Sequence, residues 1–90
     1  MNETTFRVML TSTGFPEPAI IEREANLATT DHMHDYSACA LILDGEISVV
    51  TADGTTTCGP GDTFTLNSGT THHEEYGPAG ARLLFSRRVP

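Results

Sequence analysis

Short apolar runs separated by turn residues dominate the pattern of this 90-residue chain. Apolar and polar residues alternate in segments such as Thr63–Leu66, which places Phe64 and Leu66 on one face of a predicted strand. Turn signals rich in glycine, proline, asparagine and aspartate recur about every eight to ten residues. No segment has a sustained helical period, so we expect an all-β sandwich or barrel.

From the N-terminus onward, the sequence predicts an arm followed by a series of short strands. Residues 1–18 are predicted to be an arm, with a strand at Phe6–Leu10 and then a loop, and Ala19–Leu27 is predicted to be extended. Two strands are expected within residues 37–51, joined by a hairpin at Asp44-Gly45, since this dipeptide tolerates positive φ. Further turns are expected at Asp53-Gly54, Gly59–Asp62, Asn67–Gly69 and Gly77–Gly80, and a closing strand at residues 81–88.

One predicted strand is apolar on both faces. Ala40 and Ile42 are expected to point inward, which leaves an outward row of Cys39, Leu41 and Leu43. A strand half exposed to water is expected to be polar on its outer face. We therefore predict a homodimer in which a second subunit covers this row. Cover by another part of the same chain is the alternative.

Acidic residues outnumber basic ones by twelve to five, which gives a net charge of −7. Phosphate backbones and anionic lipid surfaces repel such a chain, so we expect neither a nucleic-acid nor a membrane partner. A long apolar run and a signal-peptide pattern are both missing, which favours a soluble, cytoplasmic protein. The two cysteines, Cys39 and Cys58, are expected to be buried free thiols.

Two histidines, His32 and His34, precede the doubly apolar strand. Side chains two residues apart on a strand share a face and lie about 7 Å apart along it. The pair can therefore bind one metal ion if a third ligand comes from elsewhere, and His72 is the candidate. The alternative is a polar strand end exposed to solvent.

Both histidine segments match the spacing of two motifs of the cupin superfamily. The first motif, G-x5-H-x-H-x3-4-E-x6-G, fits His32, His34 and Gly45, with Asn26 in place of the first glycine and Ala38 in place of the glutamate. The second motif, G-x5-P-x-G-x2-H-x3-N, fits Gly61, Gly69 and His72, with Asn67 and Tyr76 in place of the proline and the asparagine.

These motifs span residues 26–76, and the chain therefore resembles a small single-domain cupin. The resemblance implies a double-stranded β-helix (jelly-roll) barrel over residues 1–90. It also implies that His32, His34 and His72 bind one divalent transition metal, namely iron, zinc, nickel or manganese. Ala38 then leaves a coordination position open.

The resemblance implies two kinds of function for such a site. Three-histidine sites resemble those of cupin dioxygenases, which implies a small metal-dependent oxygenase or isomerase acting on a small organic molecule. The chain also resembles the N-terminal cupin of arabinose-type regulators. A ligand-sensing module without a DNA-binding part is therefore the alternative.

Two further residues are catalytic candidates. Glu74 shares the face of the preceding histidine ligand if the strand continues, as a fourth ligand or a general base, although we favour a solvated acid. Tyr36 is expected to line the pocket, where its phenol can bind a substrate oxygen, or else to be a core residue. His73 has the opposite parity and is expected to point outward. Arg23 and Arg82 are candidates for a substrate carboxylate, and the sequence selects neither.

Overall fold

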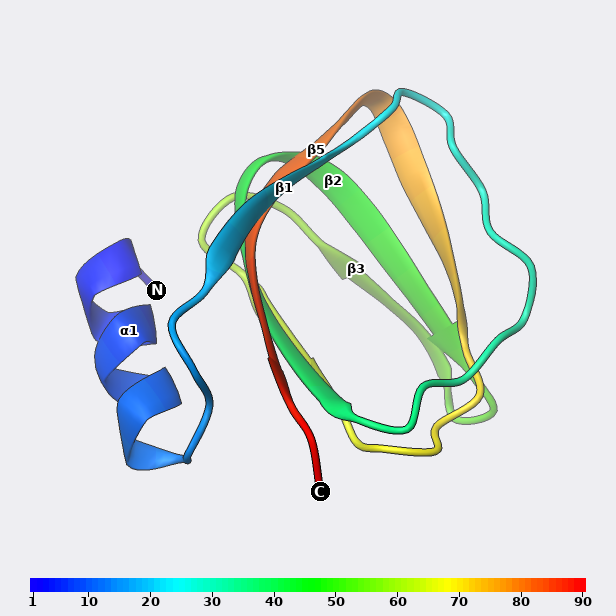
Figure 1. The fold of residues 1–90 in the computed structure, drawn as a ribbon. Helices are drawn as coiled ribbons and strands as arrows, with labels where there is room; N and C mark the ends of the chain where they lie inside the picture. The colour runs from blue at the N-terminus through cyan, green and yellow to red at the C-terminus, as the bar shows by residue number, and fades with distance from the viewer.

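The computed structural model describes residues 1–90 as a bent antiparallel sheet with one helix on its outer face (Figure 1). The sheet order is β1-β5-β2-β3, and β4 also pairs with β2. The long strands β2 and β5 pair with each other, which makes them the centre of the fold. The elements are α1 (Glu3–Ser12), β1 (Ala19–Arg23), β2 (Ser37–Thr51), β3 (Gly54–Cys58), β4 (Thr63–Leu66) and β5 (His73–Arg88).

Side chains alternate across this sheet and form a core on each of its faces. The inner core contains Ala40, Ile42, Ile47, Val49, Cys58, Tyr76, Ala81 and Leu83. The outer core contains Phe6, Leu10, Cys39, Leu41 and Leu84. Both cysteines are buried and free, as predicted. Phe64 and Leu66 of β4 pack together against the inner core, which confirms their shared face.

The N-terminal segment is a helix, so the strand predicted at Phe6–Leu10 is wrong. Asn2 caps the helix by accepting a hydrogen bond from the Thr5 N–H at 2.8 Å. Phe6 and Leu10 are four residues apart, lie on the same helical face and are buried against the sheet. No helix in the structure has the length and apolar character needed to span a membrane.

Helix α1 covers the outward apolar row of β2. Cys39 and Leu41 pack in the outer core with Phe6 and Leu10, and Leu43 packs at its margin. The same chain therefore provides the cover, which was the alternative to a second subunit. The predicted homodimer loses this argument and stays an untested prediction.

Two of the predicted glycine turns are bends within long strands. Asp44-Gly45 lies inside β2 and Gly77–Gly80 inside β5, where the register between the two strands shifts. Gly45 and Gly80 have φ values of 79° and 68°, which the bend requires. Such bulges bend and twist a strand without reversing it, so β2 and β5 curl around the inner core. The other three predicted turns do separate strands, as expected.

Truncation of Phe6 tests the packing of α1. Phe6→Ala is expected to lower the free energy of unfolding by about 3–5 kcal/mol, because the ring is fully buried between helix and sheet. The control is Val8→Ala on the same helix, where the side chain is exposed and the expected change is within about 0.5 kcal/mol. Urea denaturation measures both, and equal effects would contradict a packed helix.

Candidate metal centre

Three imidazoles meet where the segment before β2 runs beside the start of β5. His32 and His34 lie on that segment, and His72 directly precedes β5. The backbones of His32 and His72 form a β-bridge with two reciprocal N–H···O bonds of 2.9 Å. One ring nitrogen from each of the three histidines lies within 4.8 Å of the other two. The structure thus brings together the three residues that the motif spacing selected.

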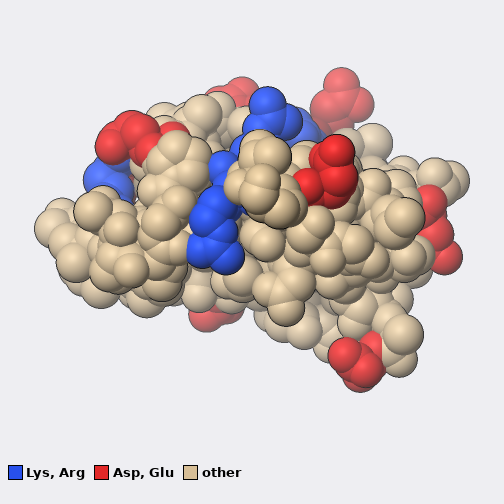
Figure 2. Space-filling model, turned by 60° about the horizontal axis from the view of Figure 1, so that its bottom comes forward, with Lys and Arg blue, Asp and Glu red and all other residues tan.

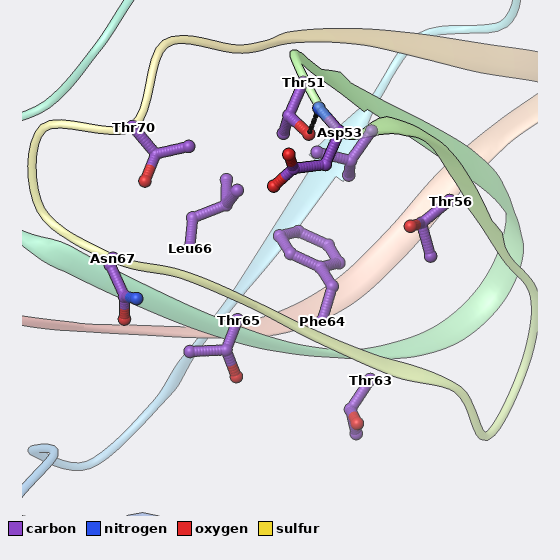
Figure 3. Close-up of a pocket in the computed structure, with 10 residues that line it drawn as sticks. Thr51, Asp53, Thr56, Thr63, Phe64, Thr65, Leu66, Asn67 and Thr70 are labelled. Carbon is purple, nitrogen blue, oxygen red and sulfur yellow. Dashed lines mark hydrogen bonds between the residues drawn. The ribbon is translucent and has the colours of Figure 1, made fainter.

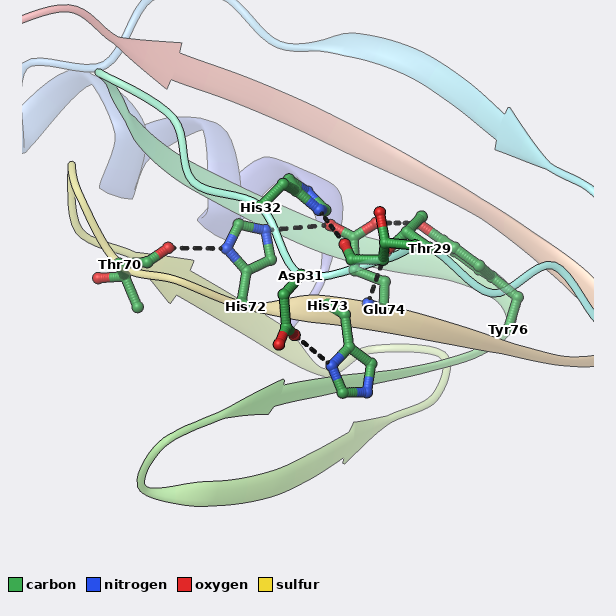
Figure 4. A network of polar contacts seen from close by, with 9 residues as sticks. Thr29, Asp31, His32, Thr70, His72, His73, Glu74 and Tyr76 are labelled. Atoms are coloured by element: carbon green, nitrogen blue, oxygen red, sulfur yellow. Dashed lines mark hydrogen bonds and ion pairs between the residues drawn. The ribbon is translucent and has the colours of Figure 1, made fainter.

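Backbone carbonyls orient two of the three rings. Nδ1 of His32 lies 2.7 Å from the Thr30 oxygen, and Nδ1 of His72 lies 2.9 Å from the Thr70 oxygen (Figure 4 shows the second contact). Because a carbonyl oxygen only accepts, Nδ1 is the donor in both contacts, and in the neutral form of each ring the lone pair is on Nε2. Metal-binding histidines commonly have their second nitrogen fixed in this way.

The Nε2 atom of His72 has no hydrogen-bond partner, although the side chain is only 2% exposed. The Glu74 carboxylate comes within 3.4 Å of it without forming a hydrogen bond. A lone pair and a carboxylate oxygen are both acceptors, so neither satisfies the other unless a proton or a cation lies between them. Unpartnered buried polar atoms are rare in native proteins. The site therefore fits a cation.

His34 completes the cluster and packs on Tyr36. The two rings are stacked with centroids 4.6 Å apart, and the His34 ring centroid lies 4.9 Å from that of His32. Burial, followed by the neighbouring His32 and His72 rings, lowers the pKa of His34. The neutral form is the one that binds a metal, so this environment favours ligation near neutral pH.

Glu74 faces the cluster, so the favoured reading of it as a solvated acid is wrong. Strand β5 continues past Glu74, and only 18% of its side chain is exposed. Its Oε2 accepts a hydrogen bond from the Tyr76 hydroxyl at 3.1 Å, and its backbone N–H donates to Thr29 Oγ1 at 2.9 Å (Figure 4). Burial, followed by the charge of Glu74, raises the pKa of Tyr76, so this phenol stays a donor. Tyr76 thus fixes the direction of the carboxylate.

His73 points away from the cluster, as its parity predicts. Its Nδ1 lies 2.8 Å from Oδ1 of Asp31 (Figure 4). These two residues are the sequence neighbours of His72 and His32. Their hydrogen bond therefore joins the segment before β2 to β5, beside the bridge that carries two of the cluster histidines.

A pocket of about 380 Å³ opens beside the histidine cluster. Its polar lining includes Thr29, His32, His34, Tyr36, Glu74 and Tyr76, and its apolar lining includes Ile21, Phe64, Leu83 and Phe85. Arg23 and Arg87 complete it. The structure therefore places Tyr36 and Glu74 in one pocket with His32 and His34. Their catalytic roles stay predictions.

The structure also separates the arginine candidates. Arg82 lies near Glu22 and Asp44, at 3.8 and 3.9 Å, and does not line the pocket. Arg23 does line it. Arg87 was missed by the sequence reasoning, although it shares the inward parity of Leu83 in the closing strand. That alternation is the signal that selects it.

A second pocket, of about 410 Å³, contains no histidine (Figure 3). Its lining is rich in hydroxyl groups, from Thr51, Thr56, Thr63, Thr65 and Thr70, and includes Asp53 and Asn67. Phe64 lines both pockets. None of the three candidate metal ligands lines this second pocket.

Comparison with known families gives a match to the cupin domain over residues 20–84. The chain belongs to the cupin family. The match includes both histidine segments and all five strands except the first residue of β1 and the end of β5. Together with the antiparallel sheet, it confirms the predicted double-stranded β-helix of this cupin. A search of curated proteins gave no match.

Several solved structures share the fold. A protein of unknown function from Rhizobium leguminosarum is 18% identical, with 100% of this chain and 98% of that chain covered and a TM-score of 0.71. The polyketide cyclase RemF from Streptomyces resistomycificus is 26% identical, with 86% and 58% covered and a TM-score of 0.65. A cupin from Desulfitobacterium hafniense is 15% identical, with 79% and 64% covered and a TM-score of 0.67. This cupin thus spans less than two thirds of the last two.

Proposed function

We propose that this cupin is a metal-dependent enzyme acting on a small carbonyl compound. His32, His34 and His72 hold one divalent transition-metal ion, either iron, zinc, nickel or manganese. The observation that carries the proposal is the unpartnered Nε2 of buried His72, which faces the other two imidazoles. When bound, such an ion supplies a Lewis acid that polarises a substrate oxygen.

The carboxylate nearest the cluster comes from Glu74 and not from the motif position. Ala38 occupies that position, is buried in β2 and offers no ligand atom. Glu74 is the one acidic residue that lines the pocket. The first motif thus lacks its carboxylate at Ala38, whereas a carboxylate follows the histidine of the second motif, at Glu74. Tyr76 holds this carboxylate in place.

In this proposal Glu74 is the general base that moves a proton beside the histidine cluster. In an isomerisation it takes a proton from the carbon next to the carbonyl and returns it to a neighbouring atom, so no oxidant or reductant is consumed. Tyr76 holds its Oε2 and leaves Oε1 directed at His72. In the proposal, Tyr36 donates a hydrogen bond to the substrate, and its stacking on His34 in the pocket wall supports this role.

Two observations support an enzyme of this class. The anchored carboxylate next to three imidazoles combines a general base with a metal site, which a purely structural barrel does not need. The 26%-identical structural relative is a polyketide cyclase, so a cupin barrel of related sequence supports an enzyme activity. An oxygenase is the alternative, since a three-histidine site leaves room for dioxygen.

Metal content and turnover together test the proposal. Elemental analysis of protein purified without added metal is expected to give close to one metal ion per chain. The loaded protein is then mixed with hydroxyketones, diketones, thiols and catechols, with proton exchange followed by NMR in D₂O and oxygen consumption by electrode. Protein that stays metal-free after reconstitution contradicts the proposal. Loaded protein that binds these compounds without converting them is a ligand-sensing module.

Substitution of Glu74 separates a proton-transfer role from a ligand role. Glu74→Gln is expected to lower kcat by about 10²–10⁴-fold while the metal content stays close to one ion per chain. Glu75→Gln, one residue further along β5 and exposed, is expected to keep both quantities unchanged. Loss of the metal together with turnover in Glu74→Gln would instead make this carboxylate a ligand.

A further inference from the structure

Three of the five arginines have no acidic partner, and two of these three line the pocket beside the histidine cluster. Arg7 and Arg82 form ion pairs with glutamate or aspartate, and Arg88 donates to a backbone carbonyl. Arg23 and Arg87 pair with no carboxylate, in a chain that has twelve acidic residues. Arg23 donates to the Glu22 backbone oxygen at 3.1 Å, so what the two share is the lack of a carboxylate partner. In so acidic a chain, two such guanidinium groups in one pocket favour an anion from outside the protein.

Arg87 enters the pocket from β5. It alternates with Leu83 and Phe85, which line the same pocket, so all three side chains are on one face of the strand. Its guanidinium carbon lies 5.4 Å from the centre of the Tyr36 ring, which stacks on His34 at 4.6 Å. These two separations place the guanidinium within about 10 Å of the His34 ring, a length that a small organic molecule spans.

The charge around the pocket also favours an anion. Figure 2 shows basic side chains near the middle of one face, with acidic side chains beside them and along its margins. Glu74, the one acid in the lining, is already held by the Tyr76 hydroxyl. A negative ligand is repelled by the exterior of the molecule, which carries a net charge of −7, and is attracted at this pocket.

We propose that the pocket binds an organic carboxylate with a small apolar body. Arg87 holds the carboxylate, because a guanidinium matches its two oxygens in a bidentate geometry, and Arg23 adds a second positive charge. The apolar body contacts the wall formed by Ile21, Phe64, Leu83 and Phe85. The inference rests on the proposed function in that it names the substrate class of the same site.

Binding of benzoate and of its neutral analogue benzamide tests the anion site. Both are titrated calorimetrically into metal-free and metal-loaded protein. Benzoate is expected to bind at least about tenfold more tightly than benzamide, since a hydrogen bond to a charged group adds that much selectivity. Arg87→Gln is expected to remove the preference. The control is Arg82→Gln, in the same strand but outside the pocket, which is expected to keep it.

Each outcome decides the inference. A preference for benzoate that is lost only in Arg87→Gln supports it. Equal affinity for the two compounds in the wild type, or an equal preference in the two variants, overturns it. Benzoate that binds only to loaded protein and ignores Arg87→Gln is a metal ligand, which also overturns it. The titration of metal-free protein measures benzoate binding at the arginine site without a metal. Failure of metal binding is therefore distinguishable from failure of this inference.

Discussion

Replacement of His72 by alanine is expected to abolish metal binding by this cupin. His72 is buried, its Nδ1 is fixed by Thr70, and its Nε2 faces the other two imidazoles without a hydrogen-bond partner. Loss of a contact that merely orients a ligand costs about 10–100-fold in metal affinity, so loss of the ligand itself is expected to cost more than about 100-fold. Calorimetric titration with zinc measures the change.

The adjacent histidine provides the matched control. His73→Ala removes an imidazole one residue away, but this ring points outward and pairs with Asp31. An exposed ion pair contributes about 0–1 kcal/mol, so the loss of metal affinity is expected to stay below about tenfold. If His73→Ala loses the metal as completely as His72→Ala, His72 is not the only ligand from this segment, and the register of β5 assigned here is contradicted.

Substitution of Gly45 is expected to have the largest effect on stability. A Cβ atom at this position would lie 2.0 Å from the backbone oxygen of Gly80 and 2.8 Å from its carbonyl carbon. Both are main-chain atoms of the bend in β5, so relief requires separation of the two central strands. Gly45→Ala is therefore expected to cost roughly 4 kcal/mol or more, or to prevent folding.

Gly69 separates the clash from the backbone strain. Its φ of 82° is close to the 79° of Gly45, but a Cβ atom there would have no neighbour within 4 Å. Gly69→Ala is expected to cost only the strain of the left-handed conformation, about 1–2 kcal/mol. Urea denaturation of the two variants measures the difference. Equal destabilisation would mean that β2 and β5 do not approach each other closely at Gly45.

The features of the fold that depend on strand parity were predictable from the sequence. Alternation placed Phe64 and Leu66 together, and it correctly directed His73 away from the cluster. The strand predicted at Phe6–Leu10 was wrong because a run of five mostly apolar residues fits the period of a strand and that of a helix equally well. The hairpin predicted at Asp44-Gly45 was wrong because a glycine with positive φ fits both a bulge and a hairpin. Only the pairing of β2 with β5 distinguishes the two.

The candidate site was predicted in part. Motif spacing selected the three histidines that the structure places within 4.8 Å of one another. The alternation of side chains along the strand assigned Glu74 to the face of the histidines. It does not predict how exposed the Glu74 side chain is, because this depends on Tyr76 and on the segment that runs beside β5. The unpaired state of Arg87 is a property of the whole charge distribution, since it depends on where every acidic residue lies.

X-ray absorption at the zinc edge tests the central claim, that three histidines of this cupin hold one metal ion. Protein loaded with one equivalent of zinc is expected to show three imidazole ligands at about 2.0–2.1 Å, and two at most in His34→Ala. A zinc environment in the wild type with no imidazole, or with the same imidazole count in both proteins, would contradict the account.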